Sequence, residues 1–338
     1  MTRLRKIPTT VITGFLGAGK TTLVRHILEN AGGRRFALIV NEFGDIGVDG
    51  ELLKSCGIAG CRDDDMVELA NGCLCCTVAD EFIPTMRKLI ERDAPPDHIV
   101  IETSGLALPK PLVKAFDWPE IRSKVTVDGV IAVVDGAAVA EGRFADDVEA
   151  LRALAEHDNP LEEVFEDQLA CADIVLLNKA DLLDEAGLAA VIAEVTGKLR
   201  GGVKALPSRH GRVDLAVLMG LEAAVEDDLA ARPSHHDLED GHDHDDFESF
   251  AVTVPAVDDL TALETRLKRT LAEFDILRLK GFLHVAGKDM RHVVQAVGTR
   301  LQRYYDRPWA TDEARQGRLV VIGLKGIARE AITAAILG

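Results

Sequence analysis

The stretch that decides the fold is Gly14-Phe15-Leu16-Gly17-Ala18-Gly19-Lys20-Thr21, which fits the pattern G-x-x-x-x-G-K-[ST]. An apolar strand candidate at residues 10–13 precedes it, and a helix candidate at residues 20–29 follows it. In that setting the glycines let backbone N–H groups face phosphate oxygens, and the helix N-terminus adds partial positive charge. The stretch therefore predicts the phosphate-binding loop of a nucleotide site.

Individual residues of this loop are expected to contact the phosphates and Mg²⁺. We expect Lys20 to reach the β and γ phosphates and the Thr21 hydroxyl to ligate Mg²⁺. The alternative, a glycine-rich turn with a chance lysine, is disfavoured by the strand before the loop and the helix after it. The expected nucleotide-binding residues are Gly14, Gly17, Ala18, Gly19, Lys20, Thr21 and Thr22.

Short and nearly continuous apolar runs recur along the first half of the chain. They lie at residues 10–13, 36–40, 98–102, 129–135, 174–177 and 203–206. Such runs are typical of central parallel strands that are covered on both faces, and helical segments alternate with them. We therefore predict an α/β domain at residues 1–232, doubly wound around a mostly parallel sheet, with an insertion of two amphipathic helices at 141–171.

A polar tract at residues 233–246 separates this half from the rest. It holds His235, His236, His242 and His244 among many carboxylates, and it cannot form a core, so we interpret it as a linker. Weak binding of divalent metals and simple solvation explain its composition equally well.

Beyond the tract, residues 247–338 predict a smaller α+β domain. Strands are expected at 247–255, 276–285 and 318–324, and helices at 260–271 and 327–337, while residues 290–301 show a mixed pattern.

Charge and hydropathy exclude several classes of protein. The 338 residues include 39 Lys and Arg against 56 Asp and Glu, so the net charge is −17. A surface this negative repels nucleic acid, although a local pocket can still hold one nucleotide. No apolar run approaches the roughly 18 residues of a membrane span, and the polar start lacks a signal-peptide stretch. We expect a cytoplasmic protein, in which the six cysteines are thiols or metal ligands rather than disulfides.

A second motif, Asn178-Lys179-Ala180-Asp181, follows the strand candidate at 174–177. This N-K-x-D pattern is typical of guanine recognition, in which the Asp181 carboxylate accepts from the N1–H and the exocyclic amine. Adenine offers no donor at N1 and has no amine at that position, so ATP would leave a buried carboxylate unpaired. The alternative is a helix start capped by Asp181. Combined with the phosphate-binding loop, the motif predicts that Asn178, Lys179 and Asp181 select GTP.

Two further segments are expected at the γ-phosphate. In Glu102-Thr103-Ser104-Gly105 the carboxylate can hold Mg²⁺ and the Gly105 N–H can face the phosphate, although a strand end that caps a helix is the alternative. Residues 41–49 contain Glu42, which could orient water, Mg²⁺ or a second metal, and an acidic turn-rich loop explains them equally well. The catalytic candidates are Lys20, Thr21, Glu42 and Glu102.

The most unusual feature is Cys73-Leu74-Cys75-Cys76. Thiolates at Cys73, Cys75 and Cys76 can converge on one divalent metal and leave a coordination position open, which suits a metal that is passed on. The alternative is three buried core cysteines, but the flanking Asn71, Gly72 and Thr77 are not typical of a core.

Taken in order, GFLGAGKTT, NEFGDIGVD, CLCC, ETSG and NKAD resemble the CobW-type metal-chaperone P-loop GTPases, and the resemblance covers nearly the whole chain. It implies hydrolysis of GTP coupled to delivery of a metal bound by Cys73, Cys75 and Cys76. It also implies that Glu42 and Glu102 lie near the metals, with Glu102 and Thr21 at Mg²⁺.

Within this family, residues 141–171 and Asp117-Trp118-Pro119 resemble the branch that acts in cobalamin synthesis. That branch implies Co²⁺ as the metal and a cobaltochelatase, or another metal-accepting protein, as the recipient. Other members handle zinc, and the thiolate ligands suit Zn²⁺ at least as well. A kinase-like transferase and a metal buffer with a secondary nucleotide site are the competing functions. A homo-oligomer is compatible with the sequence. The phosphate-binding loop contains no arginine, which predicts slow turnover of GTP by the isolated protein.

Overall fold

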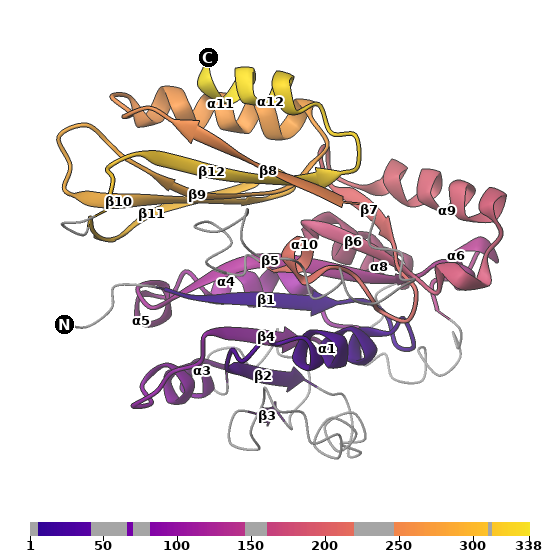
Figure 1. The fold of residues 1–338 in the computed structure, drawn as a ribbon. Coiled ribbons are helices and arrows are strands. Elements are labelled where there is room, and N and C mark those ends of the chain that lie inside the picture. The colour runs from indigo at the N-terminus through magenta and orange to yellow at the C-terminus, as the bar shows by residue number, and fades with distance from the viewer. Residues whose placement is uncertain (1–5, 42–65, 70–81, 146–160, 220–246, 310–312) are drawn as a thin grey trace. The chain divides into compact units, whose positions relative to one another are not determined.

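A computed structural model (Figure 1) describes residues 6–41, 66–69, 82–145, 161–219, 247–309 and 313–338. The chain divides into two compact units, Lys6–Leu215 and a second that begins at Ala216 and ends at Gly338. Each unit is described by itself.

The first unit is built on a seven-stranded sheet with the order β3-β2-β4-β1-β5-β6-β7, in which every pair of neighbours is parallel. The strands are β1 (Ile7–Thr13), β2 (Phe36–Asn41), β3 (Met66–Leu69), β4 (His98–Glu102), β5 (Val125–Asp135), β6 (Ile174–Asn178) and β7 (Lys204–Pro207). Each of the expected strands is present, and the predicted doubly wound parallel sheet is confirmed.

Helices alternate with these strands, as a parallel sheet requires because each crossover must return the chain to the same edge. They are α1 (Lys20–Glu29), α3 (Ile83–Ile90), α4 (Pro109–Ala115), α5 (Pro119–Arg122), α6 (Gly136–Ala140), α8 (Leu161–Cys171) and α9 (Glu185–Lys198). One core cluster joins α3, α4 and α5 to β1, β2 and β4. A second joins α8 and α9 to β5 and β6.

Strand β5 is longer than the sequence pattern predicts. It begins at Val125 rather than at residue 129, and all 11 of its residues are buried, including Asp128. Polar Thr126 and Asp128 interrupt the apolar run, so the sequence pattern does not indicate the first residues of the strand. Strand β3 was not predicted, because its four residues at the sheet edge include only a short apolar run.

The second unit contains a five-stranded sheet with the order β11-β10-β9-β12-β8, paired antiparallel throughout. Its elements are β8 (Phe247–Val254), α11 (Leu260–Glu273), β9 (Ile276–Leu283), β10 (Met290–Val297), β11 (Arg300–Pro308), β12 (Gly317–Leu324) and α12 (Arg329–Leu337). The smaller α+β fold predicted here is confirmed. The mixed pattern at 290–301 covers strand β10, the turn in which Gly298 takes φ +52° and the first residues of β11.

Helices α11 and α12 lie side by side on one face of this sheet (Figure 1). Leu263, Leu267 and Leu271 of α11 and Ile332 and Ile336 of α12 share a core with the apolar side chains of the strands. At the start of the unit, the buried Arg278 side chain donates to the carbonyl oxygens of Val217 at 3.0 Å and Leu218 at 2.9 Å. These bonds tie the short helix α10 (Leu215–Leu218) to β9.

Among the described residues, the helices are all too short or too polar to cross a lipid bilayer.

Neighbouring residues at the end of α12 offer a matched test of this second core. Ile336 is fully buried, whereas the side chain of Leu337 is 42% exposed. Ile336→Ala should lower the free energy of unfolding by about 2–5 kcal/mol, because it leaves a cavity. Leu337→Ala should change it by less than about 0.5 kcal/mol. Urea denaturation of the full chain measures both, and equal effects would show that α12 does not close the core.

Candidate functional site

The phosphate-binding loop joins β1 to α1 at the carboxyl edge of the parallel sheet. Gly14 takes φ +139°, and a Cβ there would lie 2.1 Å from the Val133 carbonyl oxygen. Gly19 takes φ +103°, and a Cβ there would lie 2.2 Å from the Asn178 side-chain nitrogen. Both positions therefore demand glycine, because a side chain would be strained and would collide with the neighbouring strand ends.

Lys20 and Thr21 open α1, and both point toward this edge of the sheet. The Lys20 side chain is buried, and its Nζ donates to the Phe15 carbonyl oxygen at 3.1 Å. The Thr21 hydroxyl donates to Glu102 Oε1 at 2.9 Å, although the two residues are 81 positions apart. A hydroxyl and a buried carboxylate in contact offer two oxygen ligands of the kind that Mg²⁺ prefers.

Asn178 links the phosphate-binding loop to a second loop. Its side-chain nitrogen donates to the Ala18 carbonyl oxygen at 2.9 Å, and its Oδ1 accepts from the Gly211 N–H at 2.9 Å. The side chain is almost fully buried. One amide therefore fixes two loops that approach from different strands. The sequence predicted Asn178 as a nucleotide-binding residue, and the structure shows it as the connection between the loops around the site.

Lys179 has a partner that the sequence did not reveal. Its Nζ lies 2.5 Å from Oδ2 of Asp135, a carboxylate that is only 1% exposed at the end of β5. The other oxygen of Asp135 accepts from the Ala138 N–H at 3.1 Å and caps α6. A polar residue at the end of an apolar run was the available signal for Asp135, because strand ends at this edge surround the site.

Asp181 lies in the 3-10 helix Ala180–Leu182, next to the loop that follows β7. The Ala180 N–H donates to the Ser208 carbonyl oxygen at 3.1 Å. The Asp181 carboxylate lies 3.9 Å from Nε2 of His210, whose backbone takes φ +54°. The loop at residues 208–211 thus borders the predicted guanine-binding residues, and the sequence analysis missed it because no motif marks it.

Gly105 touches the phosphate-binding loop directly. The Thr103 N–H donates to the Ile12 carbonyl oxygen at 2.9 Å, which extends the pairing of β4 with β1. A Cβ on Gly105 would lie only 2.7 Å from the backbone nitrogen of Leu16. Among the described residues, the buried hydroxyls of Thr103 and Ser104 have no hydrogen-bond partner. The segment predicted at the γ-phosphate is therefore adjacent to the loop and presents buried polar groups.

The side chain of Phe15, in the phosphate-binding loop, packs against two other aromatic rings. The ring of Phe15 stacks on that of Phe165 in α8, with centroids 5.9 Å apart, and the ring of Phe144 lies 6.3 Å from Phe15. Burial of such rings contributes both apolar area and a preferred geometry. The loop is thus held by packing as well as by hydrogen bonds.

Four predicted residues, Glu42, Cys73, Cys75 and Cys76, lie outside the described residues. Strand β2 leads into the segment with Glu42, and β3 leads into the segment with the cysteines. Asn41 and Leu69 are register partners at the ends of these strands, and Val40 pairs with Glu102. Both segments therefore begin at the edge that carries Thr21 and Glu102. Within the part of the chain that the structure describes, no group of three or more His, Cys, Asp or Glu could hold a metal.

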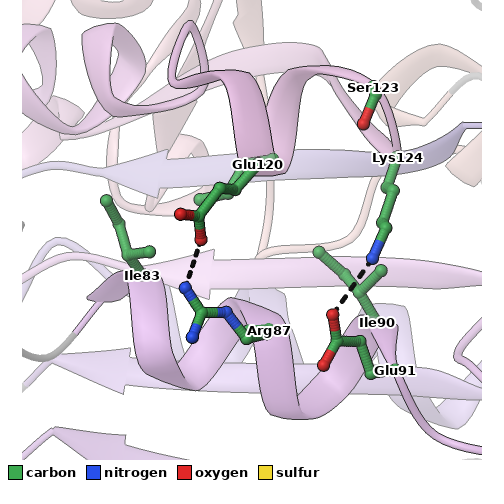
Figure 2. A pocket seen from close by; sticks show the side chains of 8 residues that line it. Ile83, Arg87, Ile90, Glu91, Glu120, Ser123 and Lys124 are labelled. Atoms are coloured by element: carbon green, nitrogen blue, oxygen red, sulfur yellow. Dashed lines mark hydrogen bonds and ion pairs between the residues drawn. The ribbon is translucent and has the colours of Figure 1, made fainter.

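A pocket of about 470 Å³ lies away from this edge, between α3 and α5 (Figure 2). Arg87 is paired with Glu120, and Lys124 with Glu91 at 3.2 Å. The hydrogen bond that Arg87 donates to the Glu120 carboxylate raises the pKa of Arg87 above its usual value. None of the predicted site residues is among the described residues that line the pocket. These are Ile83, Arg87, Ile90, Glu91, Glu120, Ile121, Ser123 and Lys124.

Comparison with known proteins agrees with this arrangement. Residues 8–207 match the nucleotide-binding domain of the CobW/HypB/UreG family, and residues 247–338 match the C-terminal domain of cobalamin synthesis protein CobW. The chain belongs to the CobW/HypB/UreG family of nucleotide-binding proteins.

Three relatives cover nearly the whole chain. The zinc chaperone CobW of a Sinorhizobium species is 56% identical over 98% of this chain and 96% of its own. The zinc chaperone CobW of Pseudomonas aeruginosa is 55% identical over 96% of this chain and 89% of its own. The zinc chaperone YjiA of Escherichia coli is 31% identical over 99% of each chain.

The connection made by Asn178 predicts a specific loss. Asn178→Ala should leave the Ala18 carbonyl and the Gly211 N–H buried without their partner, which costs about 1–3 kcal/mol for each group. We expect nucleotide affinity, measured with a fluorescent guanine nucleotide, to fall at least tenfold. Asn30→Ala removes an exposed amide that donates to the His26 carbonyl at the end of α1, and it should bind as the wild type does. Equal affinities for all three proteins would contradict this role.

Proposed function

We propose that this chain is a GTP-dependent metallochaperone, which hydrolyses GTP and passes a divalent metal to a recipient protein. The proposal is carried by the contact between the Asn178 amide and the Ala18 carbonyl, 2.9 Å apart. This contact brings the candidate guanine-binding motif to the phosphate-binding loop. A nucleotide with guanine at one end and phosphates at the other is the ligand that fits both motifs.

In this proposal Asp181 selects guanine. Its carboxylate accepts from N1–H and the exocyclic amine, and Lys179 is held beside it by Asp135. ATP is excluded because adenine lacks both donors and would leave the carboxylate unpaired. The nucleotide-binding residues are those predicted from the sequence, with Asn178 also holding the loop at residues 208–211.

Hydrolysis in this proposal depends on Lys20, Thr21 and Glu102; the Thr21 hydroxyl and the Glu102 carboxylate would hold Mg²⁺, which would offset negative charge on the phosphates. Lys20 neutralises charge on the β and γ phosphates, and the Gly105 N–H faces the γ-phosphate. Glu42 is proposed to orient the attacking water or a second metal. The phosphate-binding loop offers no arginine, so turnover by the isolated protein should be slow, on the order of 10⁻⁴ s⁻¹ as in Ras-like proteins without an arginine finger.

The cargo is proposed to bind at Cys73, Cys75 and Cys76. The names of three relatives support Zn²⁺ as the metal. Co²⁺, with a cobaltochelatase as recipient, is the second candidate, because residues 141–171 and Asp117-Trp118-Pro119 resemble the cobalamin branch. We place the activity in the cytoplasm, where thiols stay reduced.

The proposed domain organisation follows the sequence. A GTPase domain at residues 1–232 carries the metal motif, a His- and Asp-rich linker occupies 233–246, and a small α+β domain occupies 247–338. The matched family regions, 8–207 and 247–338, support these limits.

The guanine assignment predicts a change of base preference. Asp181→Asn should weaken GTP binding by about 1.5–3 kcal/mol, since a charged acceptor is lost. The new amide can instead donate to xanthine, which carries a carbonyl where guanine has its amine. We therefore expect the variant to bind xanthosine triphosphate better than the wild type does. Competition assays with GTP, ATP and xanthosine triphosphate measure this, and wild-type binding of ATP as tight as that of GTP would refute the assignment.

The metal assignment predicts coupling between two ligands. The segments with Glu42 and the cysteines begin at the edge that carries Glu102, so the γ-phosphate should organise the thiolates. We expect Zn²⁺ and Co²⁺ to bind at least fivefold more tightly with a non-hydrolysable GTP analogue than with GDP, Mg²⁺ being present in both. By linkage, the bound metal must raise the affinity for the GTP analogue, relative to GDP, by the same factor.

A cysteine control separates this motif from other thiols. Cys75→Ser combined with Cys76→Ser should abolish tight metal binding and leave binding of GDP intact. Cys171→Ser changes a half-buried thiol at the end of α8, and it should leave both properties unchanged. Equal metal affinity with the analogue and with GDP would instead favour a metal buffer.

A further inference from the structure

Helix α8 carries a buried amide that the sequence motifs do not include. Gln168 is 2% exposed, and its side-chain nitrogen donates to the Gly105 carbonyl oxygen at 3.1 Å and the Ala107 carbonyl oxygen at 3.3 Å. A side-chain amide nitrogen has two hydrogens, so one group can satisfy both carbonyls. The Gln168 side chain therefore binds the turn that follows β4 through two hydrogen bonds.

This turn is the segment that touches the phosphate-binding loop. The Ala107 N–H donates to the Ser104 carbonyl oxygen at 3.1 Å and closes the turn. Gly105 lies against the backbone of Leu16 so closely that no side chain fits between them. The Gly105 and Ala107 carbonyls of this turn are both bonded to α8 through Gln168.

The same helix also supports the phosphate-binding loop itself. Phe165, three residues before Gln168, stacks on Phe15. Residues three apart lie on one face of a helix, so a single face of α8 contacts both the loop and the turn. The separation of these two segments is thereby set by one rigid element rather than by the loops alone.

We propose that Gln168 is a positioning residue for the γ-phosphate, which holds the Gly105 amide in place by fixing the carbonyls of its turn. The proposal rests on the GTPase function proposed above. It implies that Gln168 supports the binding of GTP and its hydrolysis but contributes little to GDP, which has no γ-phosphate. A purely structural amide would instead affect both nucleotides equally.

The test compares two nucleotides on the full-length protein. Gln168→Met keeps the side-chain length but removes the donors. We expect affinity for a non-hydrolysable GTP analogue to fall about tenfold, the equivalent of one or two lost hydrogen bonds. Affinity for GDP should stay within about twofold, and single-turnover GTP hydrolysis should slow by at least the same factor as analogue binding.

Gln295→Met is the matched control. Gln295 is another buried amide, and its nitrogen donates to Gln302 at 3.1 Å in the second unit. Its replacement should lower stability without changing the ratio of analogue to GDP affinity. A ratio that Gln168→Met leaves unchanged, or that Gln295→Met changes as much, would overturn the proposal.

A second variant keeps the proposal testable if Gln168→Met fails to fold. In Gln168→Glu the ionised carboxylate repels both carbonyls, whereas the protonated form can donate to one of them. Burial raises the pKa of the introduced carboxyl. Analogue-to-GDP discrimination, normalised to the wild type at each pH, should therefore recover as the pH falls. A pH-independent ratio equal to that of the wild type would overturn the proposal.

The two proposals fail in different ways. If the wild type binds neither GTP nor GDP, the GTPase function is wrong and the role of Gln168 falls with it. If the wild type binds both and Gln168→Met weakens both equally, only the role of Gln168 is wrong.

Discussion

The candidate site depends on the buried amide of Asn178, which donates to a carbonyl of the phosphate-binding loop and accepts from an N–H of the loop after β7. The two loops leave different strands, β1 and β7, and this one amide bonds to both of them. Buried amides are costly unless satisfied, so the Asn178 side chain needs a partner from each loop. The absence of a side chain at Gly19 is what allows this amide to approach.

Much of the first unit could be predicted from the sequence because its strands are buried on both faces. Residues 98–102 and 174–177 have no polar alternation, and they are central strands, β4 and β6. The helix at residues 20–29 was predicted with its observed limits, since the loop before it fixes its start. The prediction was incomplete where burial is one-sided or polar, as in the edge strand β3, the first residues of β5 and the β10–β11 hairpin.

The candidate site was predictable where a motif keeps its chemistry within a few residues. Lys20, Thr21 and Asn178 belong to such motifs, and the structure brings their elements to one edge. Asp135, His210 and Gln168 were missed because their contacts span 29 or more positions, such as His210 with Asp181 and Gln168 with Gly105. Such contacts depend on strand order, and strand order is a property of the folded sheet.

Strand β3 has a consequence for the order in which the sheet opens. It is four residues long, lies at the end of the sheet and pairs with β2. Short edge strands belong to the least stable parts of a domain, because few backbone hydrogen bonds must break to release them. Local opening at β3 would break its pairing with β2 while β1 and β4 stay paired. The sheet thus has a low-energy opening mode at the edge, and the central strands that hold the phosphate-binding loop remain closed.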